Sequence, residues 1–167
     1  KIIDAINAHF KLSKQKPKFK GLLTTGNIDE KKIYAIKPLT FMNNSGTAIK
    51  ELIDYFKIEA KDVIVFHDDM DIDFGKVKAK FGGGSAGHNG IESIDKFIGK
   101  DYSRVRVGIG HPKQKKKVNN HVLEDFKEDE EEKIKEITEN IVRQIPTLID
   151  KKIDLFSSKV NQNLNGI

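Results

Sequence analysis

The segment His67-Asp68-Asp69-Met70-Asp71 combines one imidazole with three carboxylates. It follows the apolar run 63–66, which we predict to be a central strand covered on both faces. Polar groups at the carboxyl end of such a strand often form the ligand site of an open α/β sheet. The acidic residues are suited to three tasks: binding a divalent metal, starting a loop with ordinary turn chemistry, or orienting a catalytic imidazole.

A metal and an imidazole would make different demands on this segment. A divalent cation usually needs more ligands than these five residues supply, so we predict no metal site. An aspartate that fixes the tautomer of a histidine and stabilises its imidazolium form needs only that one partner. We therefore expect one buried carboxylate of this segment to take that role, while His67 remains open to a purely structural interpretation.

The glycine-rich segment FGGGSAGHNG at 81–90 runs into a helix that we expect to begin near His88. Glycines let the backbone approach a ligand closely, and the N–H groups at a helix start can bind an anion. The spacing fits neither a Walker A loop nor a dinucleotide-binding fingerprint. The segment therefore indicates either a ligand-binding loop or a hinge without chemistry.

A third segment, KPLTFMNNSG at 37–46, marks a turn from a strand into a helix. Asn44 or Ser45 can cap that helix, because short polar side chains favour the N-cap position. The same amides and the backbone N–H groups can also contact a ligand. Capping and binding both stay open at this point.

Alternating helical and strand patterns must position these segments. Apolar residues at helical spacing predict helices near 2–10, 48–56, 88–98 and 134–148, the last one kinked at Pro146. Alternation predicts strands at 31–36, 77–81 and 105–109. The polar face of the second strand consists of lysines, and Arg104 and Arg106 occupy the polar face of the third. The order of these elements favours an α/β layer structure.

Composition limits the possible functions. With 167 residues, 37% of them hydrophobic, the chain can bury one core, so we expect a single domain. No Cys is present, which excludes thiolate nucleophiles and disulfides. No apolar run approaches the roughly 18 to 20 residues that cross a bilayer, so we expect a soluble, cytoplasmic protein with no membrane partner. The net charge of +5 suggests a polyanionic partner, and the lysines cluster at 11–20, 76–80 and 113–117.

Taken together, these segments resemble the bacterial peptidyl-tRNA hydrolase family. The blocks that carry the resemblance are KPLTFMNNSG at 37–46, HDDMDIDFGKVKAKFGGGSAGHNG at 67–90 and RVRVGIGHP at 104–112. The resemblance implies a single α/β domain over residues 1–167, with a twisted mixed β-sheet flanked by helices on both faces. It also implies a monomeric enzyme without metal or cofactor that cuts the ester between a peptide and the 3′ ribose of tRNA.

The resemblance implies a role for individual residues. Asp68 orients the general-base histidine, and Asn43 and Asn89 hold the substrate and the attacking water. Met42 lines the peptide crevice, while the loop around Gly87 and His88 gates it. The residues expected to contact tRNA phosphate are Lys80 and Arg106.

One departure from the family concerns the catalytic base. Its histidine is expected on a loop ahead of Lys1, so the chain is expected to be incomplete at its N-terminus, and neither His67 nor His88 is assigned that role. The alternative is an RNA-binding protein of the same fold that does not catalyse hydrolysis, as in the splicing factors similar to this family. Retained Asp68, Asn43 and Asn89 favour the enzyme, since a pure binder has little use for a polarising carboxylate beside two amides.

Overall fold

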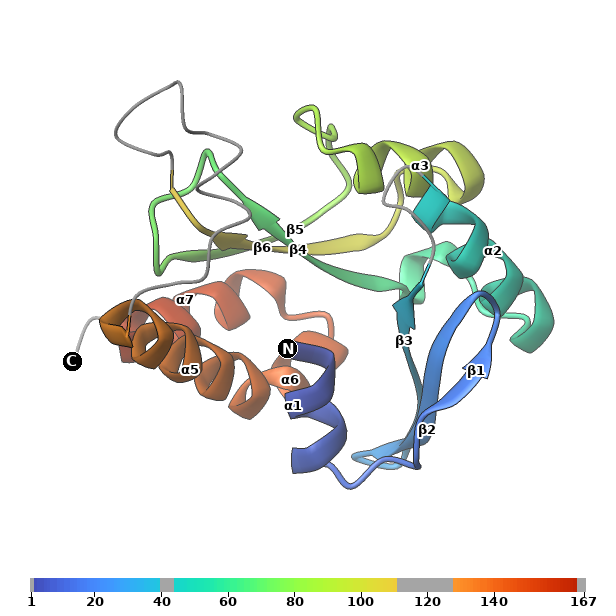
Figure 1. Ribbon diagram of the computed structural model, residues 1–167, viewed down its shortest axis with the longest axis horizontal. Helices are drawn as coiled ribbons and strands as arrows, with labels where there is room; N and C mark the ends of the chain where they lie inside the picture. The colour runs from blue at the N-terminus through green and yellow to red at the C-terminus, as the bar shows by residue number, and fades with distance from the viewer. Residues whose placement is uncertain (1, 40–43, 111–127, 165–167) are drawn as a thin grey trace. The chain divides into compact units, whose positions relative to one another are not determined.

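The computed structural model describes residues 2–39, 44–110 and 128–164, and Figure 1 shows the elements along the chain. Helices are interspersed among the strands along the chain, which confirms the predicted α/β class. The chain forms two compact units, one of residues 1–65 and 80–104 and the other of residues 66–79 and 105–167. The elements are α1 (Ile2–His9), β1 (Lys16–Lys18), β2 (Gly21–Ile28), β3 (Lys31–Pro38), α2 (Ser45–Phe56), the 3₁₀ turn η2 (Ala60–Asp62), β4 (Ile64–Asp69), β5 (Val77–Phe81), α3 (Asn89–Ile98), β6 (Ser103–Gly108), α5 (Glu128–Arg143), α6 (Ile145–Ile149) and α7 (Ile153–Leu164).

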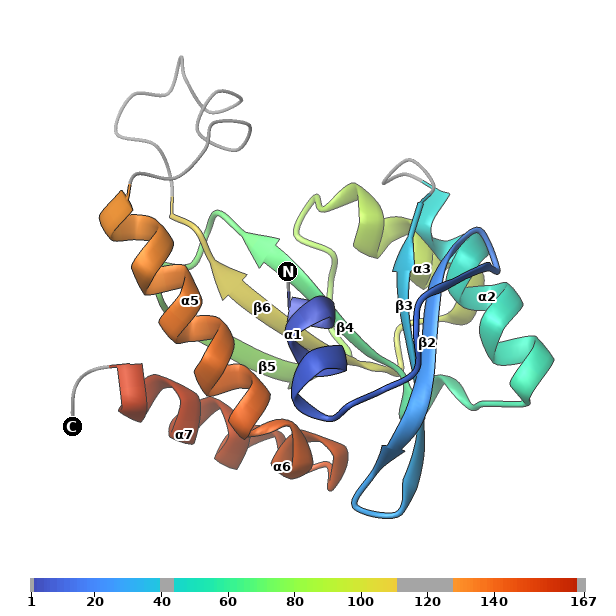
Figure 2. The same cartoon turned by 60° about the horizontal axis from the view of Figure 1, so that its bottom comes forward.

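The first sheet is an antiparallel meander in the order β1-β2-β3 (Figure 2). β2 and β3 pair along their whole length, from Gly21 opposite Pro38 to Ile28 opposite Lys31. The two residues between these strands, Asp29 and Glu30, have φ angles of 49° and 67°. Two successive left-handed residues form the turn type whose twist matches that of a hairpin. Only β3 of this sheet was predicted from the sequence.

Helix α2 packs on this sheet through a small apolar core. Leu23 of β2 clusters with Leu52 and Ile53 of the helix, and Tyr34 stacks on Phe56 with ring centroids 4.0 Å apart. Burying each such side chain contributes about 1.5–3 kcal/mol. The core therefore fixes α2 against the strands β2 and β3.

The start of α2 differs from the prediction in one detail. Asn44 occupies the N-cap position, but its side chain makes no capping hydrogen bond. Instead, the hydroxyl of Thr47 donates to the Asn44 carbonyl oxygen at 2.8 Å. The expected side-chain cap is therefore wrong for Asn44.

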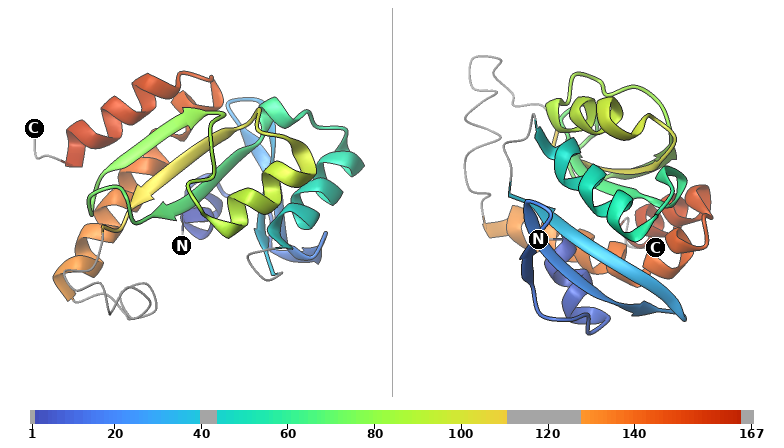
Figure 3. Two further views of the ribbon diagram at one scale, coloured as in Figure 1. Left: turned by 90° about the horizontal axis from the view of Figure 1, so that it is seen from above. Right: turned by 90° about the vertical axis from the view of Figure 1, so that its right-hand side faces the viewer.

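The second sheet has the order β4-β6-β5 (Figure 3). The Ser103 amide donates to Val63 and the Ile109 amide to Asp69, both at 3.0 Å, so β6 runs parallel to β4. Toward β5 the amide of Gly82 donates to Tyr102 and the amide of Gly108 to Lys76, which is an antiparallel pairing. The sheet is thus mixed, as predicted. Among the described residues, however, the central strand is β6 and β4 lies at an edge, which differs from the prediction that the apolar run 63–66 lies in a central strand.

Because β6 is the central strand, its first arginine, Arg104, is buried rather than exposed. Val105 and Arg104 point to opposite faces, yet their exposed fractions are 0% and 1%. Both faces of the strand are covered here, so the expected polar face does not include Arg104. On β5 the prediction holds better, since Val77 is buried and Lys78 and Lys80 are exposed.

The C-terminal segment forms three helices where one kinked helix was predicted. α5 ends at Arg143, and Pro146 stands in the first turn of α6, where a missing N–H costs no helical hydrogen bond. α7 packs against both α5 and α6 (Figure 2). Of the apolar positions predicted for this segment, Ile137, Ile141, Ile145 and Leu148 are buried, whereas Ile134 is half-buried.

Helix α7 also contacts the outer edge of β5. The side-chain amide of Asn161 accepts from the Val77 amide at 2.9 Å and donates to the Val77 carbonyl at 2.8 Å. One helical turn earlier, the Ser157 hydroxyl oxygen accepts from the Ala79 amide at 2.9 Å. Side chains of a helix thereby satisfy backbone groups that another strand would otherwise pair.

Candidate active site

The acidic segment lies at the carboxyl end of β4. Successive strand residues point to opposite faces, so Asp68 faces away from His67 and Asp69. The side chain of Asp68 is exposed, which differs from the buried carboxylate expected there. The Nδ1 atom of His67 lies 3.0 Å from the carbonyl oxygen of Asp68. Asp68 therefore presents its carboxylate outward, where a second group can approach it.

The buried carboxylate of this segment belongs to Asp69, whose side chain is only 9% exposed. Its Oδ1 accepts from the backbone amide of Asp71 at 2.8 Å, which is the hydrogen bond of an Asx turn. Its Oδ2 lies 3.6 Å from Nη1 of Arg106. Asp69 thus holds the turn after β4 and pairs with the arginine that was predicted to contact phosphate.

Arg106 is partly engaged inside the protein. Its side chain is 27% exposed, and its Nε atom is buried without a hydrogen-bond partner among the described residues. The pairing with Asp69 neutralises part of its charge. A phosphate that binds Arg106 must therefore share the guanidinium group with Asp69.

The glycine-rich loop, residues 82–88, is held at both ends. At its start, the Gly82 amide donates to the Tyr102 carbonyl at 2.9 Å, and Nη1 of Arg104 donates to the Gly84 carbonyl at 3.0 Å. At its end, the Ser85 hydroxyl lies 3.3 Å from Oε1 of Glu92 in the first turn of α3. These ties favour a formed binding loop over a plain hinge.

A tight turn brings this loop into α3. The His88 amide donates to the Ser85 carbonyl at 3.0 Å, and the two residues between them, Ala86 and Gly87, have φ angles of 51° and 79°. The backbone amide of Ile91 then donates to Nδ1 of His88 at 3.2 Å. His88 is thus the N-cap of the helix, a role that requires an unprotonated Nδ1.

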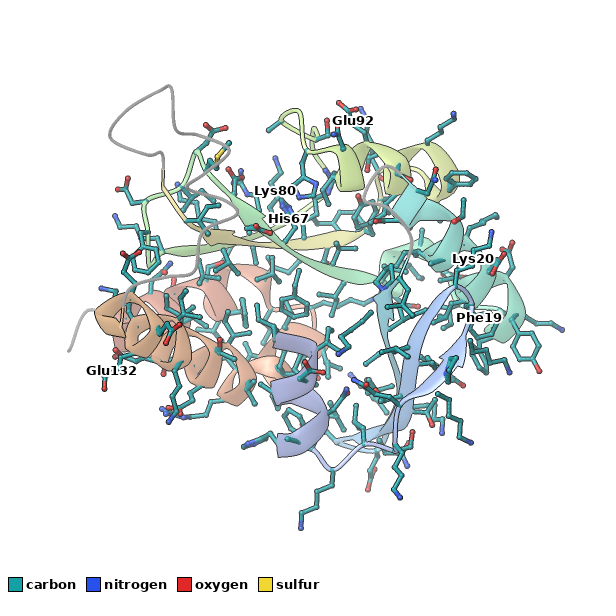
Figure 4. All side chains as sticks on the ribbon, viewed as in Figure 1. Phe19, Lys20, His67, Lys80, Glu92 and Glu132 are labelled. Carbon is teal, nitrogen blue, oxygen red and sulfur yellow. The ribbon has the colours of Figure 1, made fainter. Side chains whose placement is uncertain are left out.

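Two more predicted residues lie near this loop. Asn89 is the first residue of α3 and is exposed, so its amide stands at the positive end of the helix dipole. Lys80, labelled in Figure 4 together with Glu92, is exposed on β5. Its ammonium group lies beside Gly83. One unit of the protein therefore brings together a helix start, an amide side chain and a cation next to a glycine loop.

The model of the family described as peptidyl-tRNA hydrolase matches residues 1–166. The chain belongs to the peptidyl-tRNA hydrolase family. Among curated relatives, it is 73% identical to a peptidyl-tRNA hydrolase of Pelagibacter ubique over 161 residues, which cover 96% of this chain and 87% of that relative. It is 42% identical to a peptidyl-tRNA hydrolase of Ehrlichia canis, over 98% of this chain and 83% of that relative. The predicted resemblance is confirmed.

Solved structures of the peptidyl-tRNA hydrolase family agree with this fold. The crystal structure of the enzyme from Acinetobacter baumannii matches with a TM-score of 0.87 at 28% sequence identity. The match covers 96% of this chain and 82% of that one.

Some of the predicted residues lie outside the described part of the chain, and one set of buried residues was not predicted. Met42, Asn43 and the basic segment 113–117 lie outside the described residues. Sequence reasoning missed the set of Asp95, Tyr102 and Arg104, whose contacts reach the glycine loop. Nothing in the sequence pattern set Arg104 apart from Arg106, since both arginines alternate with valines on the same strand.

Two further features, a metal-binding group and a membrane-spanning helix, are absent from the described residues. Within residues 2–39, 44–110 and 128–164, no three His, Asp or Glu side chains gather as a metal-binding group. No helix of that part of the chain is long and apolar enough to span a bilayer.

Proposed function

We propose that this chain hydrolyses the ester that joins a peptide to the 3′-terminal ribose of tRNA, and so recycles tRNA from peptidyl-tRNA lost by ribosomes. Family membership over residues 1–166 carries this proposal. The exposed Asp68 at the end of β4 and the exposed Asn89 at the start of α3 support it, because both polar groups are accessible to a substrate. The protein acts as a monomer in the cytoplasm, where its substrate arises.

The reaction needs a water molecule, a base and a group that stabilises the oxyanion. In the proposed mechanism a histidine acts as general base and takes a proton from water as the water oxygen bonds to the ester carbon. Asp68 orients this imidazole and stabilises its charged form. The carbon–oxygen bond to the ribose then breaks, and the 3′ oxygen takes the proton. The products are a peptide carboxylate and a tRNA with a free 3′ hydroxyl.

Amide side chains position the reacting atoms. Asn43 and Asn89 donate hydrogen bonds to the substrate and hold the water, which contributes most when the donors match the developing oxyanion. Met42 lines the peptide crevice, and Gly87 and His88 border it. No metal or cofactor takes part.

The phosphate groups of tRNA supply much of the binding energy. Lys80 offers an exposed ammonium group beside the glycine loop, and Arg106 adds the exposed part of its guanidinium. Such contacts do not depend on base sequence. They therefore suit a substrate class that includes many different tRNAs.

The decisive experiment is a time course of tRNA release from N-blocked aminoacyl-tRNA by the purified protein, combined with a tRNA-binding assay. Hydrolysis supports the proposal. Binding without hydrolysis would instead favour the RNA-binding protein of the same fold, and the absence of both would reject the two functions together.

A further inference from the structure

A buried guanidinium group lies beneath the glycine-rich loop. Arg104 is 1% exposed and donates three hydrogen bonds, of which two are to backbone carbonyls. Nη2 donates to Oδ1 of Asp95 at 3.1 Å and to the carbonyl of Lys100 at 3.2 Å. Nη1 donates to the carbonyl of Gly84 at 3.0 Å. Only the last of these contacts reaches the loop.

The other partners of Arg104 hold the guanidinium plane in one orientation. The Tyr102 hydroxyl donates to Oδ1 of Asp95 at 2.7 Å, and the guanidinium carbon lies 4.5 Å from the centre of the Tyr102 ring. Removing charges from water is costly unless they are paired and hydrogen-bonded. Here one carboxylate, one ring and the backbone carbonyls fix the direction in which Nη1 points.

Gly84 faces open space on the side that a side chain would occupy. A β-carbon there would meet no atom of the described residues within 4 Å, so no described side chain packs against that side of its backbone. The neighbouring ties are the Gly82 amide on Tyr102 and the Ser85 hydroxyl on Glu92. The hydrogen bond from Arg104 therefore holds the last glycine of the run, directly before the turn that carries Gly87 and His88.

We propose that Arg104 is a positioning residue, which sets the glycine loop so that Gly87, His88 and Asn89 reach the substrate in one fixed arrangement. The proposal rests on the hydrolase function, but the hydrogen bond from Arg104 to the Gly84 carbonyl does not. Arg104 does not touch the substrate. It acts through the Gly84 carbonyl, with Asp95 and Tyr102 as its support.

The test compares Arg104→Lys with a matched control. Lysine keeps the charge opposite Asp95, but a single ammonium group cannot satisfy the separated acceptors that the planar fork of arginine reaches. The control is Thr24→Val, because Thr24 is equally buried at 1% and its hydroxyl donates to Asn7 at 2.7 Å. This substitution removes a buried hydrogen bond in the same unit without touching the loop.

Two measurements are made on the full-length protein, well below the unfolding temperature of each variant. Hydrogen exchange without substrate reports on the loop through the His88 amide, which should exchange faster in Arg104→Lys and remain as in the unchanged protein in Thr24→Val. Steady-state kinetics on peptidyl-tRNA should give a fall in kcat of about 10- to 100-fold for Arg104→Lys. Its KM should change much less, because the phosphate contacts remain.

A third variant tests how much the support of Arg104 by Tyr102 contributes, compared with the hydrogen bond from Arg104 to the loop. Tyr102→Phe removes the hydroxyl bond to Asp95 and keeps the ring beneath the guanidinium, so its fall in kcat should be smaller than that of Arg104→Lys. An unchanged exchange rate of the His88 amide in Arg104→Lys would mean that the hydrogen bond from Arg104 to Gly84 does not hold the loop. Equal losses of kcat in Arg104→Lys and Thr24→Val would overturn the positioning role. Faster exchange in a protein that hydrolyses nothing would support the role of the hydrogen bond from Arg104 and overturn the proposed hydrolase function.

Discussion

Gly46 of α2 approaches the backbone of Ser93 in α3 so closely that a β-carbon there would overlap the Ser93 carbonyl group. Its amide donates to the Ser93 hydroxyl at 2.9 Å. The two helices lie side by side at this point (Figure 1). The glycine that ends the 37–46 block therefore fixes the spacing between α2 and α3, which carry two of the three sequence segments with chemical character.

Replacing this glycine should destabilise the fold. Gly46→Ala would force the helices apart, and overpacking of this kind costs about 1–3 kcal/mol. Gly84→Ala is the control, because a β-carbon there meets no atom within 4 Å and should change stability by less than about 1 kcal/mol. Urea unfolding of both variants measures the difference. Equal free energies of unfolding would mean that the helices tolerate a wider spacing.

Removing the charge of Asp68 should affect turnover far more than binding. Asp68→Asn leaves the histidine base without its orienting carboxylate, and we expect kcat to fall by about 10²- to 10⁴-fold while tRNA affinity stays nearly unchanged. Asp54→Asn is a matched control, since Asp54 is an exposed carboxylate on α2 that pairs with Lys50. Single-turnover hydrolysis and a binding titration make the comparison. A full rate in Asp68→Asn would remove this residue from the mechanism.

The proposed phosphate contacts predict a salt effect. Lys80→Ala should weaken binding of peptidyl-tRNA and reduce the slope of log affinity against log salt concentration by about 1. Hydrolysis of a short acyl-nucleotide should hardly change, because it lacks the contacted phosphate. Lys32→Ala, an exposed lysine on β3, removes the same charge as a control. Equal losses for the long and the short substrate would contradict a phosphate contact at Lys80.

Arg106 needs a separate comparison, since it pairs with the buried carboxylate of Asp69. Arg106→Ala should both flatten the salt slope and lower stability by about 1–3 kcal/mol, because a buried acceptor loses a partner. Thermal unfolding beside the binding titration separates the two effects. A stability loss with an unchanged salt slope would mean that Arg106 serves only Asp69.

The buried hydroxyl of Tyr102 leads us to expect that the protein loses stability at alkaline pH. Burial, together with its hydrogen bond to Asp95, raises the pKa of Tyr102 above the ordinary value of 10.0. The neutral phenol is therefore favoured by folding, and its stabilisation is complete below about pH 10 and is lost as the pH rises toward the pKa of the folded state. Tyr102→Phe should be less stable at pH 8 yet lose less stability between pH 9 and 12. Parallel curves for the two proteins would exclude this residue as the cause.

The sequence predicted the elements whose periodicity reflects simple burial. The helix near 88–98, the lysine face of β5 and the apolar positions of α5 and α6 were confirmed, because each has one covered and one exposed face. Strands β1 and β2 were missed, since Thr24 and Gly26 interrupt the apolar pattern of β2 and the turns on either side of it use Phe19 with Lys20 and Asp29 with Glu30 rather than a typical glycine.

Tertiary pairing explains the remaining errors. Arg104 looked like a surface residue because nothing in the sequence reveals that Asp95 and the Gly84 carbonyl lie beside it. In the same way, the sequence does not distinguish Asp68 from Asp69. Only the pleat of β4 turns Asp68 toward solvent and Asp69 toward Arg106. The family was recognised from three blocks of sequence, whereas the contacts that support the site come from residues between those blocks.

The contacts of α7 with β5 also bear on self-association. An uncovered strand edge is a template on which a second copy can add a strand and start an aggregate. Asn161 and Ser157 occupy the backbone groups of Val77 and Ala79 that such a strand would use. Fraying of α7 would uncover them, so the tendency of this protein to aggregate should follow the local opening of its last helix and not its global unfolding.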